Sequence, residues 1–124
     1  MHLEISSAVN FISFIIEISY RNHLYKISKN NLKKFRKNLK KILKQNFKNQ
    51  WFPNNPHKAS SLRTLRINNQ GIDSRIELAC LLTNISSHSD KLDAIFRINH
   101  DGCFYNFKEG FLKSFKETLI QDVT

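Results

Sequence analysis

A short polar segment near residue 90 contains the side-chain types of a hydrolase triad: Ser87, His88, Ser89 and Asp90. A serine nucleophile, a histidine base and an orienting carboxylate normally converge from separate parts of a fold. Adjacent residues on one short loop seldom reach each other in that geometry. The segment therefore does not predict a hydrolase.

His100 and Cys103 supply half of the ligands that a structural zinc ion needs. Such an ion normally takes four ligands, provided as two closely spaced pairs. His57, Cys80 and His88 are not spaced to provide the second pair. There is no glycine-rich phosphate loop either, and the carboxylates are too scattered for paired acid–base chemistry. We therefore predict a binding module rather than an enzyme, with no metal and no cofactor.

A dense cluster of positive charge offers a different kind of binding. Residues 21–50 contain eleven Lys and Arg and no Asp or Glu, in a chain of net charge +10. Such a concentration attracts polyanions, either RNA or acidic proteins, with a strong dependence on salt. The alternative is an ordinary solvated helix face. The candidate polyanion-binding residues are Lys33, Arg36, Lys37, Lys40, Lys41 and Lys44.

This basic cluster lies on a predicted amphipathic helix that follows a first helix over residues 2–20. In the first helix, apolar or aromatic side chains recur at spacings of three and four: Ile5, Val9, Ile12, Ile16 and Tyr20. In the second, the apolar stripe lies opposite most of the lysines: Leu32, Phe35, Leu39, Ile42, Leu43 and Phe47. Ser28, Asn30 and Asn31 are its candidate caps. A domain of this size needs that stripe for its own core, so we expect no membrane binding.

A small antiparallel sheet and a third helix are predicted to complete the core. The run Leu62–Ile67 alternates, which points Leu65, Ile67 and Arg63 inward and Leu62 outward. The third helix begins with Asp73 as its cap. It is expected to bury three residues and one of two adjacent leucines: Ile76, Ala79, Cys80, and Leu81 or Leu82.

The segments Leu92–Ile98 and Cys103–Phe107 predict a hairpin, because an Asp-Gly pair ends the connection between them. Its first strand places Ala94, Phe96 and Ile98 on one face. A last helix is indicated by apolar spacing near the C-terminus: Phe111, Leu112, Phe115 and Leu119. The predicted fold class is α+β, with several helices packed around a small antiparallel sheet.

Size and composition agree with one folded unit. The chain has 124 residues, 40% of them apolar, which is enough for a packed core. The apolar stretch Ala8–Ile16 is too short to cross a bilayer and lacks the basic leader of a signal peptide. Two cysteines do not make a disulfide framework. We expect an intracellular protein, located in the cytoplasm and the nucleus.

The most informative stretch is Phe47–Ile67. Trp51 is the only tryptophan of the chain, and Pro53 and Pro56 are its only prolines. Proline disfavours helix at the residue before it, so the second helix should end near Gln50. Trp51 and the aromatic residue beside it can then fix the chain to the core. This composition predicts a structural corner.

The corner resembles the first signature box of the BTG/Tob antiproliferative family. That box has the pattern aromatic-x-x-x-Trp-aromatic-Pro-x-x-Pro-x-Lys-Gly-Ser-Gly-aromatic-Arg, and it is matched here by Phe47, Trp51, Phe52, Pro53, Pro56, Lys58, Ser60 and Arg63. The N-terminus is similar to the opening helix of that family, and the resemblance continues through Gly71–Ile85 and Asp90–Phe107. It implies a BTG/Tob-like domain over residues 1–108, with residues 109–124 as a helical extension packed on the same domain.

The resemblance implies a non-enzymatic adaptor. Members of this family dock on the DEDD-type nuclease subunit of the CCR-NOT deadenylase complex, promote mRNA deadenylation and restrain cell proliferation. Their contact uses an aromatic residue after the Lys-Gly-Ser-Gly stretch, and a tryptophan and an aspartate that open a second box. By position, these three residues are Leu62, His88 and Asp90 here, and Lys58 of the first box is a fourth expected contact.

Several of these positions depart from the family pattern. Leu62 replaces the aromatic residue, His88 replaces the tryptophan, and the stretch after Lys58 lacks both glycines. Interface energy concentrates in a few buried anchors, each of which can contribute about 2 kcal/mol or more. Leu62 can still fill an apolar pocket, whereas His88 would fill a tryptophan pocket poorly. Two alternatives therefore stay open: a basic RNA-binding module, and a BTG/Tob fold that has exchanged its protein partner.

Overall fold

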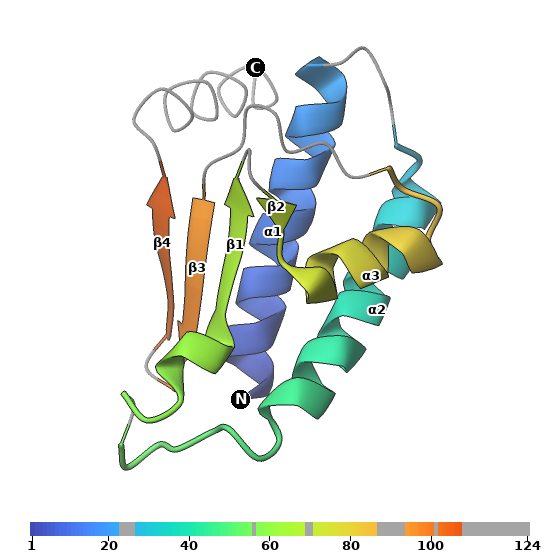
Figure 1. The fold of residues 1–124 in the computed structure, drawn as a ribbon. Coiled ribbons are helices and arrows are strands. Elements are labelled where there is room, and N and C mark those ends of the chain that lie inside the picture. Colours follow the sequence, from blue (N-terminus) through green and yellow to red (C-terminus); the bar gives the residue numbers. More distant parts are fainter. Residues whose placement is uncertain (23–26, 56, 69–70, 87–93, 101, 108–124) are drawn as a thin grey trace.

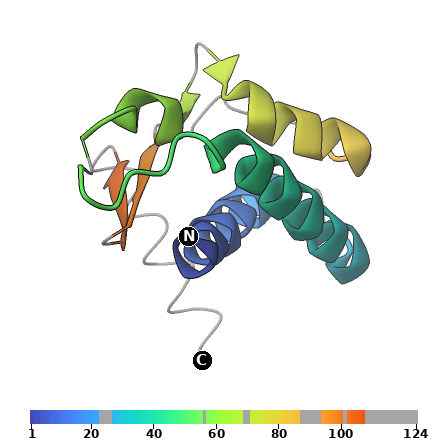
Figure 2. The ribbon, with the colours of Figure 1, turned by 90° about the horizontal axis from the view of Figure 1, so that it is seen from below.

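Three helices gather on one side of a small antiparallel sheet in the computed structural model of the chain (Figures 1 and 2). The structure describes residues 1–22, 27–55, 57–68, 71–86, 94–100 and 102–107. Its helices are α1 (His2–Asn22), α2 (Lys29–Phe47) and α3 (Ser74–Leu82), with a 3-10 helix, η1 (Ser60–Arg63). The strands are β1 (Thr64–Asn68), β2 (Gly71–Ile72), β3 (Ala94–Asn99) and β4 (Gly102–Phe107), in the sheet order β2-β1-β3-β4. The predicted α+β class is confirmed.

Helix α1 is the element on which both the sheet and α2 pack (Figure 2). Four residues of the predicted face, Ile5 to Ile16, are buried, and the side chain of Tyr20 is not among the described ones. Three further residues are buried beside this face: Ala8, Ile15 and Ile18. Phe11 and Phe14 are half-buried against the core, and the ring of Phe11 meets Phe96 of β3 edge-on, at 6.1 Å between centroids. Helix α1 is therefore covered on two sides, by α2 and by the sheet.

Helix α2 begins where its sequence predicts. The hydroxyl of Ser28 caps it by accepting a hydrogen bond from the Asn31 backbone N–H at 3.1 Å. Five residues of the predicted stripe are buried, whereas Ile42 is half-buried: Leu32, Phe35, Leu39, Leu43 and Phe47. The helix ends at Phe47, and a turn closes it as the Gln50 N–H donates to the Phe47 carbonyl at 2.9 Å. The predicted end near Gln50 is confirmed.

Strand β1 is shorter than the sequence predicts. Leu62 and Arg63 belong to η1, and the strand begins only at Thr64. The reason lies one residue before η1, where Ala59 adopts a left-handed conformation with φ 58° and turns the chain. The Leu62 N–H then bonds to the Ala59 carbonyl, and the Thr64 hydroxyl to that of Ser60. The predicted inward directions of Arg63, Leu65 and Ile67 are nevertheless correct.

Strand β2 was not predicted from the sequence, because two residues are too few to show an alternation. It pairs with the end of β1 in the register Ile67↔Ile72 and Asn68↔Gly71. The Asn68 side-chain oxygen accepts the Gly71 N–H at 3.1 Å. This short hairpin turns the chain from β1 towards the start of α3 (Figure 1).

Helix α3 confirms the predicted cap and corrects one burial. The Asp73 carboxylate accepts the Arg75 backbone N–H, and the three predicted small and apolar residues are buried. Neither Leu81 nor Leu82 is buried, however, because they are 69% and 59% exposed. Thr83 takes the inner position instead, and its hydroxyl bonds to the carbonyl of Ala79 at 2.8 Å.

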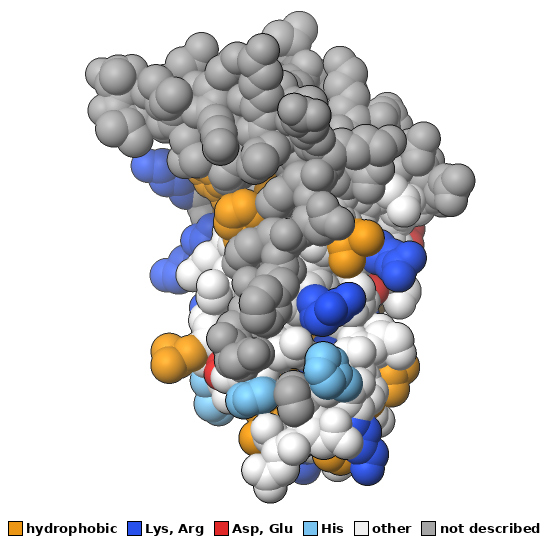
Figure 3. Space-filling view, turned by 90° about the vertical axis from the view of Figure 1, so that its left-hand side faces the viewer, with side chains coloured by type: hydrophobic (Ala, Val, Ile, Leu, Met, Phe, Trp, Pro, Cys, Tyr) orange, Lys and Arg blue, Asp and Glu red, His pale blue; other side chains and the backbone are white. Residues whose placement is uncertain are grey.

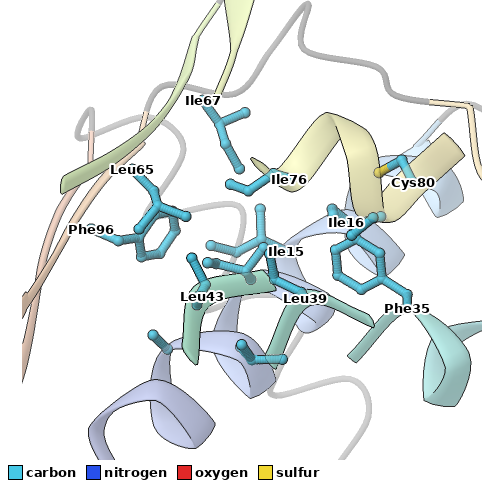
Figure 4. Packing of buried hydrophobic residues seen from close by; sticks show 14 of the residues in the cluster. Ile15, Ile16, Phe35, Leu39, Leu43, Leu65, Ile67, Ile76, Cys80 and Phe96 are labelled. Carbon is cyan, nitrogen blue, oxygen red and sulfur yellow. The ribbon is translucent and has the colours of Figure 1, made fainter. Parts of the chain in front are cut away.

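The predicted hairpin corresponds to β3 and β4. Their pairing runs from Ala94↔Phe107 to Asn99↔Gly102, and Ala94, Phe96 and Ile98 are all buried, as expected. Figure 4 shows the resulting core, where sheet residues meet residues of all three helices: Leu65, Ile67 and Phe96 from the sheet, and Ile15, Leu39, Leu43 and Ile76 from the helices. Leu92 and the predicted C-terminal helix lie outside the described residues.

Candidate partner-binding surface around Leu62

The predicted corner is formed by Trp51, which is half-buried against the core. Its ring stacks on Phe47, the last residue of α2, with 6.4 Å between centroids. The guanidinium of Arg63 also lies over the Trp51 ring, 5.7 Å from the ring centroid. Phe52 is half-buried and is covered by the Lys58 ammonium at 4.5 Å. Trp51 therefore connects the corner to the core through its contacts with Phe47 and Arg63.

Arg63 is the central residue of this corner and is only 2% exposed. Its Nε donates to the Ile98 carbonyl at 3.0 Å, and one terminal nitrogen donates to the Asn99 side-chain oxygen at 3.1 Å. The other terminal nitrogen donates to the carbonyls of Gln50 and Lys58, at 2.5 and 2.8 Å. Burial lowers the pKa of Arg63, but a guanidinium stays charged in proteins. One cation thus ties together the turn after α2, the corner loop and the end of β3.

Arg75 holds the other side of the same segment. It pairs with Asp73, with its Nε and one terminal nitrogen each 2.9 Å from a carboxylate oxygen. Its other terminal nitrogen donates to the Leu62 carbonyl at 2.7 Å. The guanidinium also lies 5.8 Å from the ring centroid of Phe47. Arg75 therefore connects η1 to the beginning of α3 and to the end of α2.

Leu62 lies on the segment that Arg63 and Arg75 hold in place, and it is 54% exposed to solvent. It lines an open hollow of about 480 Å³ together with residues of α2, η1, β1 and α3: Asn46, Gln50, Ser61, Thr64, Asp73, Ser74 and Arg75. The hollow is mostly polar, so Leu62 is its apolar feature. The sequence prediction that Leu62 is exposed is correct, although the residue lies on η1 and not on a strand.

The other expected contacts are placed only in part. Lys58 is exposed, but it does not line the hollow, and its ammonium lies on Phe52. His88 and Asp90 lie outside the described residues, as does Pro56, and Pro53 is exposed. The sequence reasoning did not identify Arg75 as a support for Leu62. The sequence signal for Arg75 was its position two residues after Asp73, where its side chain can pair with that carboxylate. The sequence analysis considered Asp73 only as the cap of the third helix.

Three of the groups considered for chemistry have described side chains: Cys80, His57 and His100. Cys80 is 2% exposed, and burial, with a smaller contribution from the charge of Glu77, raises the pKa of its thiol to about 12. A thiol of that pKa is protonated at neutral pH and is a poor nucleophile. His57 and His100 are exposed, and the described residues contain no group of three or more potential metal ligands. In the described part of the chain, no helix is long and apolar enough to span a membrane.

The predicted polyanion-binding residues lie on the outer side of α2, with one exception. Lys33, Lys37 and Lys41 are exposed, and Lys40 and Lys44 are half-buried. Arg36 instead contacts α1, because one of its terminal nitrogens donates to the Ser13 hydroxyl at 3.2 Å. On the face that Figure 3 shows, basic and apolar side chains of the described residues are scattered in small groups.

These features define a small α+β domain in which the half-buried Trp51 and the buried Arg63 support the exposed Leu62. The family model described as the BTG family matches residues 1–101, so the chain belongs to the BTG family. The Maternal B9.10 protein of Xenopus laevis is 35% identical over 86 residues, which are 68% of this chain and 34% of that protein. Protein BTG1 of Homo sapiens is 28% identical over 111 residues, which are 80% of this chain and 62% of that protein. The chain thus spans about a third of the Xenopus protein and about three-fifths of BTG1.

Proposed function

We propose that this domain is a non-enzymatic adaptor that binds the DEDD-type nuclease subunit of the CCR-NOT deadenylase complex. In this role it promotes mRNA deadenylation and restrains cell proliferation, in the cytoplasm and the nucleus. Membership of the BTG family supports the proposal. The contact is expected to involve Leu62, with Lys58, His88 and Asp90 around it.

The observation that carries the proposal is the exposed position of Leu62 on a rigid support. An anchor contributes most when its backbone is already fixed, because little conformational entropy is then lost on binding. The residue after Leu62 is the buried Arg63, and the Leu62 carbonyl is held by Arg75. Leucine is smaller than the aromatic residue of the family pattern, yet it can fill an apolar pocket on the partner.

The test is a binding measurement by calorimetry or pull-down, with purified nuclease subunit. We expect direct association, and we expect Leu62→Ala to weaken it by roughly 30-fold, the equivalent of about 2 kcal/mol. Leu82→Ala is the matched control, because Leu82 is 59% exposed at the far end of α3, away from the hollow. Equal effects of the two changes, or no association of the folded protein, would contradict the proposal.

A second pair of changes separates a weakened contact from an exchanged partner. Leu62→Phe combined with His88→Trp restores the anchor types of the family pattern. If the parent chain binds the nuclease subunit, the double variant should bind more tightly. If the parent does not bind and the double variant does, the fold has kept its docking surface but serves another protein.

A further inference from the structure

The exposed side of α2 carries a continuous row of lysines, here called the lysine ridge: Lys33, Lys37, Lys40, Lys41, Lys44 and Lys48. At 100° per residue, these six positions fall within an arc of about 100° of the helix surface. With a rise of 1.5 Å per residue, the ridge is roughly 22 Å long. It is therefore a stripe of positive charge along one side of the helix, and the exposed Lys34 lies next to its edge.

The sequence in and around α2 contains no acidic residue that could neutralise the lysine ridge. The chain has no Asp or Glu between Glu17 and Asp73, and the first turn of α2 is not acidic. Among the described residues, the ion pairs are Met1 with Glu4 and Arg75 with Asp73, and neither involves α2. Lysines four residues apart repel each other by about 0.2–0.5 kcal/mol per pair. The ridge therefore slightly opposes helix formation, so it is not explained by the stability of α2.

The apolar side of α2 is fully occupied by the fold. Leu32, Phe35, Leu39, Leu43 and Phe47 are each at most 4% exposed. A helix that lies on a lipid surface inserts a row of apolar side chains below the headgroups, whereas the only apolar side chain of α2 that is not fully buried is the half-buried Ile42. The other side of α2 carries lysines, which are flexible point charges. Proteins use such side chains to contact phosphates independently of base sequence.

The dimensions of the ridge suit one strand of nucleic acid. A line roughly 22 Å long can follow several consecutive phosphates of one extended strand. Asn46, which lines the hollow beside Leu62, lies on the opposite side of α2 from the middle of the ridge. A strand on the ridge would therefore leave the Leu62 surface free.

We infer that the lysine ridge binds the phosphate backbone of single-stranded RNA without sequence preference. The inference does not depend on the proposed nuclease contact, because it uses a different side of α2. If the ridge makes about four phosphate contacts, the slope of log K against log salt is about −2.8. RNA affinity then falls on the order of a hundredfold between 50 and 200 mM salt.

The experiment measures fluorescence anisotropy of a labelled 20-nucleotide RNA, of mixed sequence or oligo(A), over a series of salt concentrations. Lys37→Gln with Lys44→Gln removes two charges from the ridge and keeps good helix formers. We expect this double variant to bind RNA about 10–30-fold more weakly at 100 mM salt, and its salt slope to be smaller by about 1.4. Circular dichroism verifies that its helix content is unchanged.

The matched control is Arg66→Gln with Arg97→Gln, which removes two exposed charges from neighbouring strands of the sheet. It changes the net charge equally, and we expect RNA affinity to fall less than threefold. Equal losses in both double variants would mean attraction by net charge alone and would overturn the inference. So would a chain that binds vesicles of anionic lipid but not RNA, or a ridge variant that binds RNA as tightly as the parent.

Discussion

The corner around Arg63 and the lysine ridge of α2 both carry positive charge, but the two regions use it in opposite ways. In the corner, Arg63 and Arg75 donate to backbone carbonyls and side-chain oxygens at 2.5–3.3 Å from several different segments. On the ridge, four of the six lysines are exposed and two are half-buried, and the other side of the helix is buried. The corner cations therefore stabilise the fold, whereas the ridge lysines are available to contact a partner.

The largest expected effect comes from removing the central cation of the corner. Arg63→Met should lower the free energy of unfolding by about 3 kcal/mol, because the carbonyls of Gln50, Lys58 and Ile98 lose a buried donor. Denaturant unfolding followed by Trp51 fluorescence measures it. Arg66→Met is the control on the same stretch of chain, since Arg66 is exposed. It should change stability by less than about 0.5 kcal/mol, and similar losses in both variants would contradict the comparison.

A smaller loss is expected at the second cation of the corner. Arg75→Gln removes the ion pair with Asp73 and the donors to Leu62 and Thr64, at a partly exposed position. We expect a loss of about 1–2 kcal/mol in unfolding free energy. The change should also speed hydrogen exchange in η1, since its connection to α3 is gone. Unaltered exchange of the η1 amides would show that Arg75 does not support Leu62.

One change in the corner should stabilise it. Ala59 has φ 58° and ψ 23°, a left-handed conformation that strains any residue with a Cβ. Ala59→Gly should therefore raise the unfolding free energy by about 1 kcal/mol. Ser61→Gly is the matched control, because the family pattern has glycine at both positions. Among the described non-glycine residues, only Ala59 and Asn84 have positive φ, so Ser61 does not carry this strain. The control change should be neutral or slightly destabilising, and the opposite order of the two variants would refute this explanation.

The smallest effect is expected on the ridge. Lys37→Gln with Lys44→Gln should leave the unfolding free energy within about 0.5 kcal/mol of the parent, or raise it slightly by relieving repulsion. Thermal unfolding at low and at physiological salt measures this. A loss above 1 kcal/mol would mean that the ridge, like the corner, serves the fold.

Much of the fold could be predicted because local patterns specify it. The spacing of Ile5, Val9 and Ile12 defines α1, and the caps Ser28 and Asp73 mark the starts of α2 and α3. The start of β1 could not be predicted, because the conformation of Ala59 depends on the loop that precedes it. The burial of Leu81 or Leu82 was predicted wrongly, since Thr83 occupies the inner position after Cys80. The contacts at His88 and Asp90 stay predictions.

The sequence by itself determined the helical faces, the alternation in the sheet, the tryptophan–proline corner and the family to which the chain belongs. These features repeat at the fixed periods of helix and strand or stand as a contiguous motif, so neighbouring residues suffice to specify them. Only the tertiary structure decided that Arg63 joins Gln50 to Ile98 and Asn99, and that Arg75 supports Leu62. Exposure and hydrogen-bond partners depend on which distant segments cover a residue, and that is settled only when the layers pack.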